Sequence, residues 1–306
     1  MPYTKFICLD GEKVDIQDCL KNCRLKNVVN PKTGCLYVTG GRCLSRRALE
    51  MVADQREWTG KPSTTQLLRG TRESYLIITK DFAISPRDSL FMLHGTKSHG
   101  VLEKYTPEGT LSEVRLDDGI STGAFDFFDE TECEEPDTGY LYDVKTYGSY
   151  KVAHTIGLED KKIPTGQFFK NGNPKFYKVF TPTGRHDRFD LAVQLNDYRM
   201  KIKKCLGKET KQMLCEIIVR DGNTYMATSR GVTEPGYLVP INRITDKWVQ
   251  AYMTKKAKNL SIALETNVMP PPCRPRERWG GRKCSGYCQV SEFCELGKEA
   301  DVDVHD

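Results

Sequence analysis

The sequence predicts a mixed α/β fold with a cysteine-rich segment at each end. Strand-like and helix-like segments alternate from about residue 73 to residue 265. Of the twelve cysteines, five lie in the first 43 residues and four in the last 34. A hydrophobic content of 38% and a charged content of 28% are typical of a globular chain and exclude a disordered one.

The predicted elements follow from turn signals and periodicity. The first are helices at 45–58 and 61–76 (capped by Ser63 or Thr64), a helix beginning within 95–105, and strands at 111–118, 120–130 and 139–152. A helix at 188–206, a hairpin over 215–229 turning at Asp221–Gly222, and a helix at 246–265 follow. No apolar run reaches membrane-spanning length, so we expect no membrane partner and a cytoplasmic location, in the host cell for a phage protein.

Charge is distributed unevenly along the chain. Residues 112–143 contain eleven Asp or Glu against one Arg, whereas residues 151–204 contain twelve Lys or Arg against five acids. An acidic patch beside a basic stretch suits a metal site flanked by a surface for a polyanion. Two solvated faces of opposite charge explain the counts equally well.

Two acidic residues stand inside apolar strand-like runs. Asp126 lies within GAFDFFDE (123–130), and Asp143 lies within YLYDVKTY (140–147). A buried carboxylate needs a compensating partner. In a strand, Asp143 and Lys145 point to the same face, where Asp126 from the neighbouring strand joins them and two carboxylates suit Mg²⁺. Most lone Asp-x-Lys triplets, however, belong to surface strands and bind no metal.

Four motifs occur in a fixed order. They are His99 within GTKSHGVLE, the run Gly123 to Asp126, the triplet Asp143 to Lys145, and Gln194 with Tyr198 within the 188–206 helix. Together these motifs resemble those of the PD-(D/E)XK nuclease superfamily, specifically the RecB-type branch with its CRISPR-adaptation nucleases and phage recombination exonucleases. The resemblance covers about residues 90–205, and Asp143 stands where many relatives have Glu.

The resemblance implies a restriction-endonuclease-like core, α-β-β-β-α-β, with a mixed central sheet flanked by helices. It also implies metal-dependent hydrolysis of phosphodiester bonds. His99, Asp126, Asp143 and the backbone carbonyl of Val144 would then hold one or two Mg²⁺ or Mn²⁺ ions.

The other catalytic residues implied by the resemblance are Lys145, Gln194 and Tyr198. Lys145 would orient the attacking water or stabilise developing negative charge. Beside two carboxylates we expect it to stay protonated, which favours the electrostatic role over that of a general base. Gln194 and Tyr198, four residues apart on one helix face, would support the site and touch the substrate strand.

Basic and aromatic residues near these motifs are candidates for contacts with nucleic acid. We expect Lys151, Arg199 and Lys201 to contact phosphates, and Tyr147 to stack on a base. The expected substrate is DNA, single-stranded or at a duplex end. A recombination or single-strand-annealing protein is an expected partner.

The C-terminal segment, residues 266–306, contains four cysteines with a compact C-x10-C-x3-C-x5-C spacing. They are Cys273, Cys284, Cys288 and Cys294. Some RecB-type nucleases have a four-cysteine [4Fe-4S] cluster with one ligand before the nuclease motifs and three after. Either Cys273 completes a local site or an N-terminal cysteine replaces it. We prefer an iron–sulfur cluster here, although spacing alone does not exclude Zn²⁺.

The N-terminal segment, residues 1–47, has a second set of cysteines. We expect Cys8, Cys19, Cys23 and Cys43, with Cys35 as an alternate, to hold a structural Zn²⁺. The nuclease domain, with a preceding helical part, is then expected at 48–265.

The leading functional hypothesis is therefore a metal-dependent deoxyribonuclease, an exonuclease acting on ends or single strands in phage-type recombination or DNA processing. A non-catalytic nucleic-acid-binding protein stapled by zinc is one alternative, and a site-specific endonuclease is another.

Overall fold

The computed structural model describes residues 3–23, 43–55, 57–102, 104–169 and 172–302, without the side chains of residues 94, 96–99, 102, 301 and 302. The chain divides into two compact units. Unit 1 comprises Met1–Thr96, Gly119–Thr122 and Ala251–Asp306, and unit 2 comprises Lys97–Asp118 and Gly123–Gln250. The helices α5 (Leu90–Leu102) and α9 (Asp246–Thr266) continue from one unit into the other.

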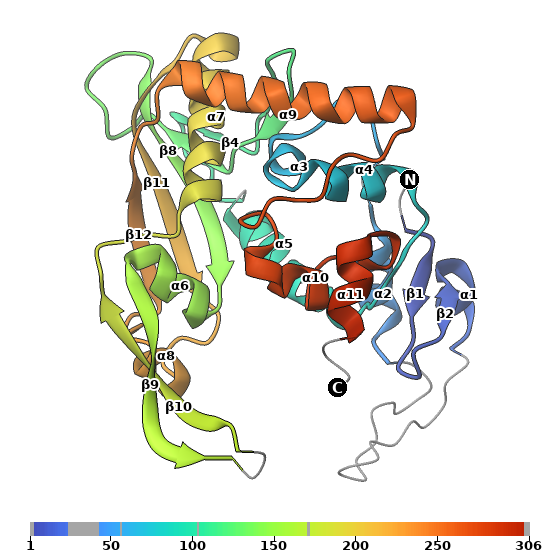
Figure 1. Ribbon diagram of the computed structural model, residues 1–306. Coiled ribbons are helices and arrows are strands. Elements are labelled where there is room, and N and C mark those ends of the chain that lie inside the picture. Colours follow the sequence, from blue (N-terminus) through green and yellow to red (C-terminus); the bar gives the residue numbers. More distant parts are fainter. Residues whose placement is uncertain (1–2, 24–42, 56, 103, 170–171, 303–306) are drawn as a thin grey trace. The chain divides into compact units, whose positions relative to one another are not determined.

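Unit 2 is built around a five-stranded sheet with the order β12-β11-β8-β7-β4 (Figure 1). The central strand, β8 (Thr138–Tyr147), is parallel to β11 (Glu209–Val219) and antiparallel to β7 (Phe127–Asp129). The outer strands β12 (Gly236–Ile241) and β4 (Thr110–Ser112) are each antiparallel to their neighbour. The mixed sheet and its helices confirm the predicted α/β class.

The other elements of unit 2 connect these strands or cover the sheet. They are β5 (Arg115–Asp117), β6 (Thr122–Ala124, shared with unit 1), α6 (Ser149–Ile156), β9 (Leu158–Phe168), β10 (Pro174–Pro182), α7 (Phe189–Leu206) and α8 (Tyr225–Ser229). The β9–β10 pair forms a separate two-stranded sheet.

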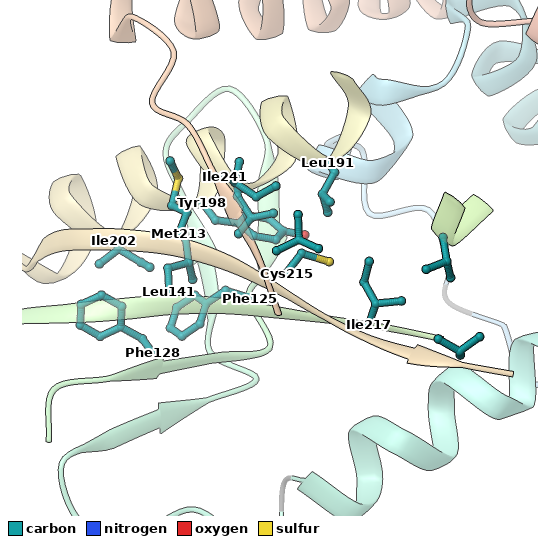
Figure 2. Packing of buried hydrophobic residues seen from close by; sticks show 14 of the residues in the cluster. Phe125, Phe128, Leu141, Leu191, Tyr198, Ile202, Met213, Cys215, Ile217 and Ile241 are labelled. Atoms are coloured by element: carbon teal, nitrogen blue, oxygen red, sulfur yellow. The ribbon is translucent and has the colours of Figure 1, made fainter. Parts of the chain in front are cut away.

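The core of unit 2 lies between α7 and one face of the sheet. Figure 2 shows Leu191, Tyr198 and Ile202 packed with Leu141 of β8 and Cys215 of β11. The predicted 188–206 helix is therefore confirmed, and its apolar spacing is the reason that it buries this face.

Two predicted strands are each divided in two. The 111–118 segment forms β4 and β5, because Glu113 between them adopts a left-handed φ of 53°. The 120–130 segment forms β6 and β7, with Phe125 and Asp126 between them. Phe125 is buried in the core, and Asp126 therefore stands at the start of β7 rather than inside a continuous strand.

Two other predictions at strand ends are wrong. The strand expected over 139–152 ends at Tyr147, and α6 begins at Ser149 after Gly148. The hairpin expected over 215–229 is not formed, because Thr224 caps α8 by accepting a hydrogen bond from the Ala227 amide. β11 pairs with the later strand β12 instead.

Unit 1 contains a three-stranded sheet of order β2-β1-β3 and several short helices. Its remaining elements are β1 (Lys5–Ile7), β2 (Lys13–Asp15), α1 (Ile16–Lys21), α2 (Arg46–Ala53), α3 (Thr64–Leu68), α4 (Thr71–Thr79), β3 (Ala83–Ile84), α10 (Arg282–Gly286), α11 (Glu295–Val302), and 3₁₀ turns at Trp279–Gly281 and Ser291–Phe293. Ser63 caps α3 as predicted, in a capping box with Gln66. No helix among the described residues is long and apolar enough to cross a bilayer.

Candidate active site and cysteine clusters

The carboxylate of Asp126 is fixed to the edge of β8. β7 begins at Phe127, opposite Tyr142, so it offers no backbone partner to Val144 further along β8. The Val144 amide donates instead to Asp126 Oδ2 at 2.5 Å. The N–H and C=O of one strand residue point to the same side. The backbone carbonyl of Val144 therefore faces the edge that carries Asp126.

Asp143 points to the α7 face of the sheet and is 1% exposed. Its Oδ2 lies 2.6 Å from Lys145 Nζ, but no donor with good hydrogen-bond geometry reaches that oxygen. Gln194 Nε2 on α7 donates to Asp143 Oδ1 at 3.4 Å and to Tyr198 Oη at 3.1 Å. The structure thus brings Asp143, Lys145, Gln194 and Tyr198 together.

Electrostatics keep Lys145 charged. Burial lowers the pKa of Lys145, but the charges of Asp143 and Asp126 outweigh burial and hold this pKa well above its usual range. Burial and the charge of Asp143 raise the pKa of Tyr198, so its phenol remains protonated. The site therefore presents one fixed cation beside two acids, and a neutral lysine base is not favoured.

The acidic groups suit a hard cation. Asp126, Asp143 and the Val144 carbonyl are oxygen donors of the kind that Mg²⁺ prefers, and the buried Asp143 Oδ2 lies 2.6 Å from the ammonium of Lys145. The side chain of His99 lies outside the described residues. Among the described residues, no group of three or more His, Cys, Asp or Glu side chains is arranged as a metal site.

Two of the expected nucleic-acid contacts are not available to a ligand. Arg199 is 5% exposed and pairs with Asp246. Lys201 is fully buried and lies 2.6 Å from Asp197. Both predictions are wrong. Asp246, distant in sequence, pairs with Arg199, and Asp197, one turn away, pairs with Lys201, so neither side chain faces solvent.

The other two expected contacts stay accessible. Tyr147 is half-buried, and burial raises the pKa of its phenol. Lys151 is exposed, with Asp187 Oδ2 at 3.3 Å from its Nζ.

The four C-terminal cysteines line one cavity in unit 1. Cys273, Cys284, Cys288 and Cys294 are joined there by Arg72 and Glu73 of α4 and by Leu76, Val290 and Leu296. Of the two ligand sets left open by spacing, this placement favours the local one with Cys273. Burial raises the pKa of the Cys288 thiol from 9.0 to about 11 and also raises the pKa of Cys273.

Features outside the cysteines complete this cavity. A Cβ at Gly70 would lie 2.2 Å from the sulfur of Cys273, so only glycine permits this approach. Arg72 Nη1 lies 3.6 Å from the sulfur of Cys294, and Lys283 Nζ lies 2.6 Å from Glu73. The sequence did not predict these contacts. Its one indication was the adjacent charged pair Arg72 and Glu73 within the otherwise apolar α4 segment.

The donor set is of the kind that binds a structural metal group. Four thiols line one cavity, and an arginine N–H is directed at one of the sulfurs. Four cysteines can hold either Zn²⁺ or a [4Fe-4S] cluster.

Three of the N-terminal cysteines interact electrostatically. Burial raises the pKa of Cys43, and the charges of Cys23 and Cys8 raise it further, which identifies these three as neighbours. Cys19 is buried on α1. Cys35 lies outside the described residues.

Comparisons with known proteins add little. No family model matches the chain, and no curated protein matches it. One solved structure, described as the crystal structure of SSO0001, aligns with a TM-score of 0.42 and 14% identity, covering 82% of this chain and 94% of that chain. A similarity this weak supports no conclusion about fold family or function.

Proposed function

We propose that the chain is a metal-dependent deoxyribonuclease of the PD-(D/E)XK type, related to the RecB-type branch. The observation that carries the proposal is the convergence of Asp126 and Asp143 on the Val144–Lys145 segment of β8, with Gln194 and Tyr198 hydrogen-bonded behind it. A purely structural ion pair between Asp143 and Lys145 would not need the second carboxylate, Asp126.

The element order also supports the proposal. A helix, two antiparallel strands, the central strand, a helix and a parallel strand occur in that order along the chain, as α5, β4, β7, β8, α7 and β11 with other elements between them. This is the α-β-β-β-α-β order of a restriction-endonuclease-like core. In this interpretation β5, β6, α6, β9 and β10 are additions within that order, and α8 and β12 follow it.

In this proposal, Asp126, Asp143 and the Val144 carbonyl bind Mg²⁺ or Mn²⁺, with His99 as a further ligand. A bound divalent ion acidifies water and neutralises charge on the scissile phosphate. Lys145, whose side chain is 23% exposed, directs its ammonium to the charge that develops on the phosphate. Gln194 and Tyr198 hold Asp143 in position.

The cysteine clusters have a structural role in this proposal. The C-terminal four would hold a [4Fe-4S] cluster, and Zn²⁺ bound by Cys8, Cys23 and Cys43 with Cys19 would stabilise the N-terminal segment. Small segments with little core commonly depend on such groups.

The test is cleavage of end-labelled DNA by the purified full chain. Single strands and duplexes, with free or blocked ends, are incubated with Mg²⁺ or Mn²⁺ and compared for wild type, Asp126→Asn and the exposed-acid control Glu134→Gln. We expect cleavage by wild type and the control only. DNA that wild type binds but never cuts with either metal would contradict the proposal, and equal cleavage by Asp126→Asn would contradict the site.

A further inference from the structure

The β9–β10 pair is a long, mostly exposed ribbon of unit 2. Its strands run antiparallel from Leu158↔Pro182 at the base to Phe168↔Pro174 near the tip. Beyond the first residues, both faces of β9 and much of β10 are exposed. Figure 1 shows the ribbon extending away from α6 and the sheet. Its outer part therefore buries little surface, whereas Leu158 and Phe180 at its base pack against the core.

The base of the ribbon is anchored to α6. The Phe180 ring lies edge-on to Tyr150 and His154, with ring centroids at 6.0 Å and 6.1 Å. Lys178 Nζ lies 2.8 Å from Asp160 and also over the Tyr150 ring. Because α6 directly follows β8, the ribbon is fixed to the strand that carries Asp143 and Lys145.

The outer part of the ribbon exposes large aromatic rings. The exposed fraction is 64% at Phe168, 55% at Phe169, 48% at Phe176 and 51% at Tyr177. A two-stranded hairpin is only marginally stable in water, and these rings add no buried core to it. Gathered aromatic side chains of this kind indicate a binding surface.

The outer part of the ribbon is basic. Glu159 and Asp160 lie at its base, and from residue 161 to residue 184 the sequence contains five lysines and no Asp or Glu. Lys162 lies opposite Lys178, whose charge is paired with Asp160 at 2.8 Å. Lys175 lies over the Phe169 ring at 5.4 Å from its centroid. Cations and exposed rings therefore occur together on the outer ribbon.

We propose that the β9–β10 ribbon binds single-stranded nucleic acid, with unpaired bases stacked on Phe168, Phe169 and Tyr177 and phosphates on Lys161, Lys162 and Lys175. Every base has a face that stacks on an aromatic ring, and lysines contact phosphates without regard to sequence. The outer ribbon offers rings for the bases and lysines for the phosphates of such a strand. An acidic protein would pair with the lysines but would not account for the exposed rings.

This inference deepens the proposed function by naming its substrate class, but it concerns binding alone. Binding is measured without added divalent metal, so that cleavage plays no part. Failure of the ribbon proposal would leave the active-site proposal standing, and loss of cleavage by Asp126→Asn says nothing about the ribbon.

The experiment measures fluorescence anisotropy of a labelled 20-nucleotide oligothymidine with the full chain. One variant combines Phe168→Ser, Phe169→Ser and Tyr177→Ser; another combines Lys161→Gln, Lys162→Gln and Lys175→Gln. The charge-matched control is Lys247→Gln with Lys255→Gln and Lys258→Gln, three exposed lysines of α9. The ring control is Tyr225→Ser, at a residue that is 85% exposed. Because all substituted ribbon residues lie at the surface, an unchanged thermal transition checks folding.

The proposal predicts that the ring variant raises Kd at least about 10-fold. Each phosphate contact to a single strand contributes about 0.7 to the slope of log K against log salt. Replacing three lysines should therefore reduce the magnitude of this slope by about 2. Both controls should bind like wild type. Ribbon variants that bind like their controls would overturn the proposal. So would tighter binding of a duplex of equal length, or binding of anionic vesicles in place of the oligonucleotide.

Discussion

Asp143 of unit 2 is held by a long strand and a long helix, whereas the C-terminal cysteines of unit 1 are held by short helices and turns. Asp143 sits at the centre of a five-stranded sheet, with its partners on α7. Cys284 lies on α10 and Cys294 ends a 3₁₀ turn, and neither element has a buried residue of its own. The first site is therefore preorganised by its core, whereas we expect the second to depend on a bound metal group.

The largest effect is expected from removing a thiol of the cavity. Cys288→Ser should unfold the C-terminal part of unit 1, since a structural metal contributes on the order of 10 kcal/mol to small domains. Calorimetry should show loss of one transition, with that of unit 2 retained. The control, Cys205→Ser at an exposed thiol on α7, should melt like wild type. If Cys288→Ser melted like wild type, the claim that the cysteine site depends on its thiols for folding would be contradicted.

The converse is expected for Asp143. Asp143→Asn should reduce cleavage by about 10³-fold or more, because it removes a charge from the metal site, while the thermal transition stays within a few degrees. Rates measured under single-turnover conditions check the first part and calorimetry checks the second. A variant that cleaves normally, or that does not fold, would contradict a preorganised catalytic carboxylate.

Lys145 separates charge stabilisation from base catalysis. Lys145→Gln should lower the cleavage rate by about 10²-fold, and Lys145→Arg should retain more activity than Lys145→Gln. The pKa of Lys145 is raised in the folded protein, so its stabilising effect is complete below its unfolded value of 10.5 and is lost only as pH rises further.

Two pH series check this expectation. Between pH 7 and pH 10, the pH profiles of cleavage by wild type and by Lys145→Arg should have the same shape. The wild-type advantage over Lys145→Gln in urea unfolding should be constant up to about pH 10. An inflection near neutrality caused by Lys145 would instead indicate a lysine acting as a base.

Gly70 tests the close approach of α4 to the cysteines. Gly70→Ala should destabilise unit 1 by about 1–3 kcal/mol, as overpacking does, because the added methyl meets the Cys273 sulfur at 2.2 Å. Gly286→Ala is the control, since nothing lies within 4 Å of a Cβ there. Urea unfolding measures both. Equal effects of the two substitutions would mean that Cys273 is not held against Gly70.

The smallest effect is expected at Tyr198. Tyr198→Phe removes the hydroxyl that accepts from Gln194, and a neutral hydrogen bond contributes about 1 kcal/mol. Cleavage should therefore fall about 5-fold, mainly in kcat, because the side chain positions Asp143 through Gln194. A change confined to KM would instead indicate direct contact with the substrate.

Local sequence patterns predicted the elements that bury one clear face. The spacing of Leu191, Leu195 and Ile202 was sufficient for α7, and the Asp143–Lys145 alternation predicted the shared face of β8. Local patterns did not predict the burial of Arg199, since its partner Asp246 is 47 residues away. The choice of Cys273 as the fourth cavity thiol likewise depended on tertiary packing.

The β9–β10 ribbon was not predicted for a different reason. Its residues show neither a helical nor a half-buried strand period, because both faces of the outer ribbon are exposed. The resemblance to nuclease motifs also gave no signal there, since the ribbon lies between the Asp143–Lys145 and Gln194–Tyr198 motifs. Only the structure brings its rings and lysines together.

The most direct test of the central claim is Mn²⁺ binding by the carboxylate site. Electron paramagnetic resonance of free Mn²⁺ can be followed during titration of wild type, Asp126→Asn combined with Asp143→Asn, and the control Glu134→Gln. The account predicts that wild type and the control bind at least one more Mn²⁺ per chain than the double variant does. Equal Mn²⁺ binding by all three proteins would contradict a metal site at Asp126 and Asp143.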